Sequence, residues 1–405
     1  MIINRNINIK LNVYTFICII FSIFCVLKVL RGADYSSTQV GGIWNYISLL
    51  YYPILIYSAL KKRYMKVSSI FVFSFLFCLG AMISVLVMSD IAYTKSFIYR
   101  FLMVPYFFLV LSSFYLNYED NRFCEKVFLF TYYVCLFINM YTIMSHQFMG
   151  ASRPMASDVY YSLGLLPFML AFEENTKRKN LFLIMQFITI FLADKRTGLI
   201  GFLSAFTIYY IIDNRATLKT KLKIIVKRII FAVVILICMY GCTLYLDSIY
   251  GLNIYSRLFN VVEDGGSGRS AMYVKLFNAF TDSNFINQLF GHGINAAGSA
   301  IGASYVHNDF LQVLYDYGII NLILFILFYL AIFIAVIKMI SKKSKYAGVF
   351  AFSLIIGLFL SMFSYFLVYY TYVTCIVAFW GVILAKERNN SINPFLKKYL
   401  TANME

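Results

Sequence analysis

The chain has 405 residues, of which 61% are hydrophobic and only 13% are charged. A soluble domain carries about 25% charged residues, so this composition excludes an ordinary soluble protein and is typical of an integral membrane protein. The formal net charge of +17 does not indicate a nucleic-acid partner, because Lys and Arg stand in short clusters between apolar segments rather than on one solvated face. The eight cysteines fall almost entirely in apolar runs and form no CxxC pair, so we interpret them as packing residues.

Apolar runs that can cross a bilayer follow one another along the chain, and a membrane-spanning helix needs about 20 such residues. The twelve predicted spans are 11–30, 43–60, 67–88, 97–116, 127–144, 156–172, 181–193, 197–212, 229–246, 319–340, 347–365 and 367–385. No internal repeat and no second domain are apparent. We therefore predict an all-α polytopic membrane protein with a single membrane domain over 1–405.

Basic residues decide the predicted orientation of these helices. The segments 61–66, 213–228 and 341–345 carry basic clusters on the same side, which the positive-inside rule assigns to the cytoplasm. The N-terminal segment MIINRNINIK is also basic and leads into the first span without a cleavage site, so we expect an uncleaved anchor. Both termini are therefore predicted to be cytoplasmic, including a tail over 386–405.

The two short spans 181–193 and 197–212 flank a charged triplet, Asp194, Lys195 and Arg196. One long helix would place the next connection, with its six basic residues, on the outer side, so two spans joined by a tight outer turn are favoured. Thirteen residues reach about 20 Å, less than the roughly 30 Å of hydrocarbon. The triplet is therefore expected at the floor of a depression open to the outside. Alternatively, Asp194 and Arg196 form an ion pair that caps the hairpin.

The connection 247–318 is the longest between predicted spans, and it faces outward. We predict that it forms a lid over a site. Its Gly-rich bend, 263–270, places Arg269 at the start of a helical pattern that is expected to lie on the membrane surface. The apolar stripe of this helix comprises Tyr273, Leu276, Phe277 and Phe280. The following segment, 289–304, is rich in Gly and Ala, so we expect irregular structure with His292 in a tight turn.

The loop ends in a segment that predicts a short helix from about Val306 to Gly318. Asn308 or Asp309 can cap its N-terminus. His307 therefore lies where the positive end of the helix dipole favours the neutral imidazole, a form that can act as a general base near pH 7. The alternative is that His307 is a polar anchor at the membrane interface.

Six basic side chains oppose the inward bias of the other Lys and Arg residues, because they lie at or beyond the predicted outer boundary. We expect this group to bind an anionic ligand. The six are Arg153, Lys195, Arg196, Arg257, Arg269 and Lys275.

Three segments in order along the chain form a recognisable pattern: KRTGLIGFL at 195–203, SGRSAMYVKLFNAF followed by LFGHG within 267–293, and HNDFLQVLYDYGIINLILF at 307–325. Together they resemble the O-antigen polymerase and O-antigen ligase superfamily of bacterial envelope glycosyltransferases, which includes the Wzy-type polymerases. The third segment is the most specific. The motifs cover about 195–330, and twelve spans with a large outer loop between spans nine and ten also resemble the layout of the family.

The resemblance implies a metal-independent, inverting glycosyl transfer at the outer face of the bacterial inner membrane, without a cofactor. Donor and acceptor would be undecaprenyl-diphosphate-linked oligosaccharides held beside membrane lipid, and a chain-length regulator is a further candidate partner. By motif position, Arg196 and Arg269 engage the diphosphate and His307 lies near the acceptor hydroxyl. Lys195 stands where many relatives have Ser, and it is a candidate for an additional phosphate contact.

Two further residues are candidates for substrate contact. Asp316 is expected to contact the acceptor sugar, while Asp309 is expected to cap its helix rather than to share acid–base chemistry with it. Tyr305 can stack on a sugar, or it is an ordinary interfacial aromatic.

We predict a polymerase, because the short outer loops besides 247–318 offer little surface for a large lipid A core. A ligase that transfers glycan to lipid A core would use the same motifs and stays the alternative. An exporter or flippase is the alternative from another class, but a transporter would place charges along a midplane cavity between repeats. Here the outer ionisable groups concentrate near one hairpin and one loop.

Overall fold

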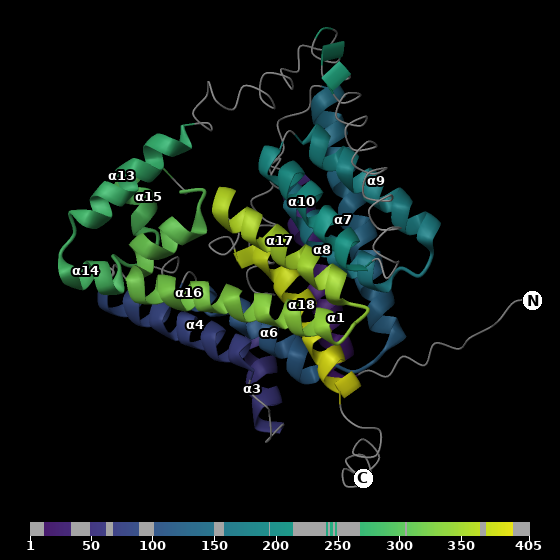
Figure 1. Ribbon diagram of the computed structural model, residues 1–405, viewed down its shortest axis with the longest axis horizontal. Coiled ribbons are helices and arrows are strands. Elements are labelled where there is room, and N and C mark those ends of the chain that lie inside the picture. Colours follow the sequence, from purple (N-terminus) through teal and green to yellow (C-terminus); the bar gives the residue numbers. More distant parts are fainter. Residues whose placement is uncertain are drawn as a thin grey trace, which may run out of the picture.

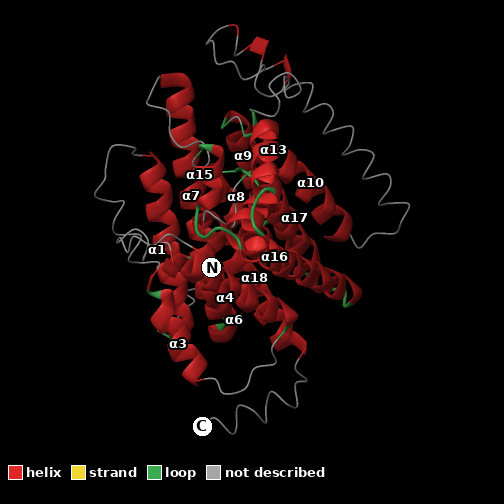
Figure 2. Ribbon diagram, turned by 90° about the vertical axis from the view of Figure 1, so that its left-hand side faces the viewer, coloured by secondary structure: helices red, strands yellow, loops and turns green. Residues whose placement is uncertain are grey.

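The structure is a computed structural model, and every regular element it describes is a helix (Figures 1 and 2). It describes residues 12–33, 49–61, 68–88, 101–149, 158–193, 195–213, 268–303, 306–364 and 370–391, with a few isolated positions between 240 and 248. The helices are α1 (Val13–Ala33), α3 (Tyr51–Lys61), α4 (Ser69–Met88), α6 (Tyr106–Asn117), α7 (Arg122–Met149), α8 (Val159–Phe172), α9 (Thr176–Leu192), α10 (Arg196–Asp213), α13 (Arg269–Thr281), α14 (Phe285–Phe290), α15 (Ala296–Ile301), α16 (Asp309–Ser341), α17 (Ala347–Phe363) and α18 (Tyr370–Ser391).

The all-helical, multi-pass character predicted from composition agrees with these elements. Every predicted span overlaps a described helix, except 229–246, of which the structure describes only isolated positions. By length and composition, the helices that can cross a membrane are Val13–Leu30, Ser69–Met88, Arg122–His146 and Asp309–Ser341. The total of twelve spans and the orientation of the chain stay predictions.

Several boundaries differ from those expected. The helix predicted over 181–193 begins earlier, at Thr176, where the Asn175 side chain accepts hydrogen bonds from the main-chain N–H groups of Lys177 and Arg178. Its 17 residues reach about 26 Å, so this arm comes closer to the full hydrocarbon thickness of roughly 30 Å than the 13 residues expected. The predicted break is confirmed, since α9 ends at Leu192 and α10 begins at Arg196.

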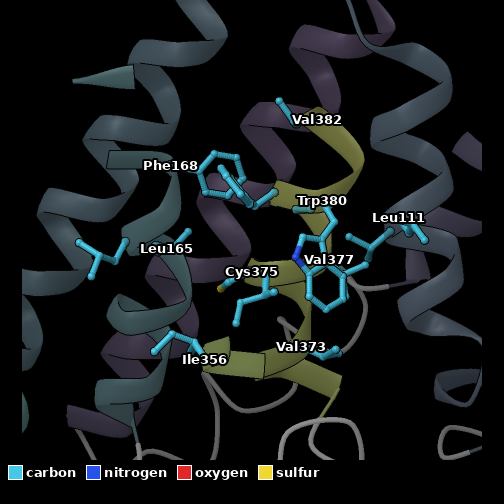
Figure 3. Packing of buried hydrophobic residues seen from close by; sticks show 14 of the residues in the cluster. Leu111, Leu165, Phe168, Ile356, Val373, Cys375, Val377, Trp380 and Val382 are labelled. Carbon is cyan, nitrogen blue, oxygen red and sulfur yellow. The ribbon is translucent and has the colours of Figure 1, made fainter. Parts of the chain in front are cut away.

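The core of the bundle is centred on α18, which is buried along much of its length. Trp380 and Val377 are fully buried between Leu111 of α6, Phe168 of α8 and Ile356 of α17 (Figure 3). The indole N–H of Trp380 donates to Ser353 at 2.8 Å, which satisfies its one polar atom. These side chains pack α18 against α6, α8 and α17.

The opposite end of α18 extends past the predicted boundary at 385. Lys386 forms an ion pair with Glu125 of α7 and lies 3.4 Å from Asp120. Its ammonium group also lies 5.1 Å from the ring centroid of Phe172. These contacts stabilise the helix beyond residue 385. The first part of the predicted tail, through Ser391, therefore belongs to α18.

A small lobe formed by α13, α14 and α15 lies at one end of the molecule, away from α3 (Figures 1 and 2). It has its own apolar cluster, whose buried members are Leu276, Ala297, Ile301, Val306 and Tyr315. The expectation of irregular structure over 289–304 was wrong in part, because α15 forms within it. The reason is a tertiary contact, since the carboxylate of Asp316 accepts a hydrogen bond from the Ala297 N–H in the first turn of α15 at 2.7 Å.

The lobe is joined to the bundle at a break in α16. Gly318 has φ 83° and ψ 174°, so the helix is interrupted there, as its sequence position predicted. Gly291 packs backbone to backbone against this break, and the N–H of Gly293 donates to the Asp316 carbonyl at 2.9 Å. Ser84 of α4 donates to the carbonyls of Phe290 and Asp316. These contacts place the lobe beside the end of α4 and the break in α16.

Candidate functional site

Helices α10, α13 and α17 meet at one main-chain carbonyl. Phe363, the last residue of α17, accepts hydrogen bonds from the Arg269 guanidinium and from the Thr197 hydroxyl, the latter at 3.2 Å. Arg269 is the first residue of α13, and Thr197 follows Arg196 at the start of α10. Two of the predicted diphosphate ligands, 73 positions apart in sequence, thus begin helices that converge on the same atom.

The local sequence explains why Arg269 begins its helix. Gly268 precedes it with φ 75°, a left-handed conformation that costs glycine little. The chain enters α13 abruptly there, and the first side chain of the helix turns toward the end of α17. A guanidinium beside the carboxyl end of a helix is electrostatically favoured, because the last carbonyls carry partial negative charge.

His307 completes the cluster from the side of α16. It stands two residues before the first helical residue, and Asn308 caps the helix by accepting a hydrogen bond from the Leu311 N–H at 3.0 Å. The preference for Asp309 as the cap was wrong, because Asn308 is the N-cap and Asp309 is the first residue of the helix, where it is buried. Burial of the imidazole, with the nearby positive charges of Arg269 and Lys195, lowers the pKa of His307 to about 4. This low pKa agrees with the expectation of a neutral imidazole near pH 7.

Positive charge dominates this cluster for two separate reasons. Lys195, Arg196 and Arg269 contribute full charges. The N-termini of α10, α13 and α16 contribute the positive ends of three helix dipoles. Main-chain N–H groups and guanidinium groups in one place are the donors that bind phosphate oxygens. The arrangement can therefore hold an anion beside a neutral imidazole.

Other predicted residues hold the lobe together. Both carboxylate oxygens of Asp316 accept hydrogen bonds, from the Ala297 N–H and from the Gln312 side chain at 3.1 Å, and the residue is 1% exposed. We assign Asp316 to positioning of α15 rather than to sugar contact. His292 stacks on Tyr315 with centroids 4.2 Å apart, and its ring nitrogens lie within hydrogen-bond distance of Ser283 and of the Tyr315 carbonyl.

The remaining predicted cations are distributed differently. Lys275 donates to the carbonyl of Ile301 at 3.2 Å, within the lobe. Tyr305, Asp194, Arg153 and Arg257 lie outside the described residues, so their predicted roles stay predictions.

Three contributors to the cluster were missed by the sequence analysis. Thr197 and the Phe363 carbonyl bring α10 and α17 to Arg269. Tyr273, predicted only as part of an apolar stripe, donates its hydroxyl to the His307 carbonyl at 3.1 Å. The available signal for Tyr273 was its position four residues after Arg269, which puts both side chains on one face of α13.

Among the described residues, no group of three or more His, Cys, Asp or Glu side chains is placed to hold a metal ion. In a comparison with protein families, the model described as O-antigen ligase matches residues 181–326. This match covers little more than a third of the chain, and it contains Lys195, Arg196, Arg269 and His307. It supports the O-antigen polymerase and ligase superfamily of membrane glycosyltransferase-like enzymes without separating polymerase from ligase. No curated protein matches the chain.

Proposed function

We propose that this protein is a surface-polysaccharide polymerase that joins undecaprenyl-diphosphate-linked repeat units at the outer face of the bacterial inner membrane. The observation that carries the proposal is the meeting of Lys195, Arg196 and Arg269 with the neutral His307 at three helix N-termini. The family match over the same residues supports it. Membrane lipid surrounds both substrates, and a chain-length regulator is a candidate partner by resemblance only.

The reaction is an inverting displacement at the anomeric carbon of the donor glycan. A hydroxyl oxygen of the acceptor attacks this carbon from the face opposite the diphosphate. The bond between the anomeric carbon and the diphosphate oxygen breaks, and the electron pair leaves on the diphosphate. Arg196 and Arg269 stabilise the developing negative charge by paired hydrogen bonds, and Lys195 adds a point charge. His307 accepts or orients the hydroxyl proton.

Donor binding prepares His307 for this role. In the free protein, burial of the imidazole and then the positive charges of Arg269 and Lys195 lower the pKa of His307, which makes it a weak base. A bound diphosphate places negative charge between the same groups and favours the protonated imidazole. The pKa of His307 therefore rises when the donor binds, and the imidazole becomes a better proton acceptor in the complex.

The pH dependence of transfer tests this account. Because the neutral imidazole is required, activity is lost as pH falls through the pKa of His307. The acid limb of kcat/KM, which reports the free enzyme, is expected near pH 4, and the limb of kcat is expected at a higher pH. A limb of kcat/KM near 6.5 that disappears in His307→Gln would contradict the lowering of the His307 pKa by burial and by the charges of Arg269 and Lys195.

The polymerase, the ligase and the exporter are distinguished by one set of incubations. Purified protein is mixed with its lipid-linked repeat unit in EDTA, without lipid A core, and the products are separated on a gel. The proposal predicts a ladder spaced by one repeat unit. Transfer only after lipid A core is added would establish the ligase, and no transfer in either mixture, with movement of the lipid-linked unit across a vesicle membrane, would establish the exporter.

A further inference from the structure

His307 has an unusual main-chain conformation for a residue with a side chain. Its φ is 59°, in the left-handed region, where the Cβ atom crowds the following carbonyl and which residues other than glycine seldom occupy. Such a conformation persists only where neighbouring contacts hold it, and such positions cluster at functional sites. The contacts that hold His307 therefore control where its imidazole lies.

Three hydrogen bonds are made at His307 and the adjacent Asn308, and the Tyr273 hydroxyl takes part in two of them. Tyr273 donates to the His307 carbonyl at 3.1 Å and hydrogen-bonds to the side chain of Asn308. Asn308 in turn accepts from the Leu311 N–H at 3.0 Å, which ties the same side chain to the first turn of α16. Tyr273 thus links α13 to the residues on which the conformation of His307 depends.

The same tyrosine sets the position of His307 relative to Arg269. Tyr273 follows Arg269 by one helical turn, so the two side chains project from the same face of α13. Their proximity is visible in the pKa of Tyr273, which burial raises and which the positive charge of Arg269 lowers in part. One helix therefore carries both the predicted diphosphate ligand and the group that holds the histidine backbone.

We propose that Tyr273 is a positioning residue that acts through His307. This inference rests on the proposed function, and it adds that the distance between the diphosphate clamp and the proton acceptor is set from α13. Tyr273 contacts neither the diphosphate nor the reacting carbon. Its hydroxyl keeps His307 in the left-handed conformation that directs the imidazole to the acceptor hydroxyl.

The first test is Tyr273→Phe, which removes the hydroxyl and retains the ring. We expect kcat to fall about 10-fold, equivalent to about 1.4 kcal/mol, with KM for the lipid-linked donor unchanged within twofold. The melting temperature should change little, because the ring still packs against the lobe. Tyr141→Phe is the matched control, since Tyr141 is 72% exposed on α7, and it should leave kcat unchanged.

A double-mutant cycle decides whether Tyr273 acts through His307. Tyr273→Phe should cost about 10-fold in the wild-type background and less than twofold in a His307→Ala background. An equal loss in both backgrounds, or no loss in the wild type while His307→Ala is impaired, would overturn the inference. If His307→Ala itself retains full kcat, the assigned role of His307 in the proposed function fails, and that outcome is separate from the first two.

Discussion

Replacing Arg269 by alanine is expected to abolish glycan transfer while the protein remains folded and inserted. The guanidinium supplies paired hydrogen bonds to a leaving group whose negative charge develops as the glycosidic bond breaks, and removal of one such donor lowers kcat by about 10²–10³-fold. In the structure this guanidinium donates a hydrogen bond to the Phe363 carbonyl at the end of α17. The measurement is the initial rate of transfer, normalised to protein that elutes as a single species.

Two variants control this experiment. Arg178→Ala makes the same substitution at an exposed position in the first turn of α9, at the end of that helix remote from Arg196, and it should retain full activity. Arg269→Lys should be intermediate, because an ammonium group keeps the charge and cannot form the paired hydrogen bonds. Transfer by Arg269→Ala at the wild-type rate would remove Arg269 from the mechanism.

Replacing Gly318 by alanine is expected to lower the free energy of unfolding more than any of the other substitutions described. A Cβ atom at this position would lie 2.6 Å from the main-chain nitrogen of Gly291 and closer still to the Leu289 carbonyl. Because both neighbours are main chain, α14 would have to move away from α16. Together with the cost of φ 83° for a residue that has a Cβ, we expect a destabilisation of about 2–4 kcal/mol. The measurement is thermal unfolding, in which the fraction of folded protein is followed as the temperature rises.

Gly302→Ala separates the steric overlap of a Cβ atom with neighbouring main chain from the conformational cost of a positive φ. Gly302 also has a positive φ, 73°, but no atom lies within 4 Å of the position its Cβ would take. It should therefore cost only about 1 kcal/mol. Equal effects of the two substitutions would mean that the close approach of Gly291 and Gly318 does not stabilise the lobe.

Features determined by neighbouring residues could be predicted from the sequence. Arg269 begins α13 after Gly268, α16 begins at the Asn308–Asp309 pair, and Gly318 interrupts it, because each depends on local capping and backbone preferences; which of Asn308 and Asp309 is the cap was not predicted correctly. A neutral His307 was also expected from its position at a helix N-terminus, but the low pKa has other causes, first the burial of the imidazole and then the positive charges of Arg269 and Lys195.

Features determined by contacts between residues far apart in the sequence could not be predicted. The Phe363 carbonyl lies 94 residues after Arg269, and no sequence pattern identifies which main-chain oxygen will receive its guanidinium. The six residues of α15 are too few for a helical period, and this helix is supported by the carboxylate of Asp316, 19 residues after Ala297. For the same reason Asp316 resembled a substrate ligand in the sequence, whereas the structure buries it.

The central claim is that one cluster of residues from α10, α13 and α16 binds a lipid diphosphate without a metal. It is tested most directly by titrating undecaprenyl diphosphate into the purified protein in nanodiscs that contain EDTA. The account predicts saturable binding that Arg196→Ala and Arg269→Ala each weaken at least 10-fold. Lys342→Ala should have no effect, since Lys342 lies at the end of α16 opposite His307. Equal affinity in the wild type and both arginine variants would contradict the claim.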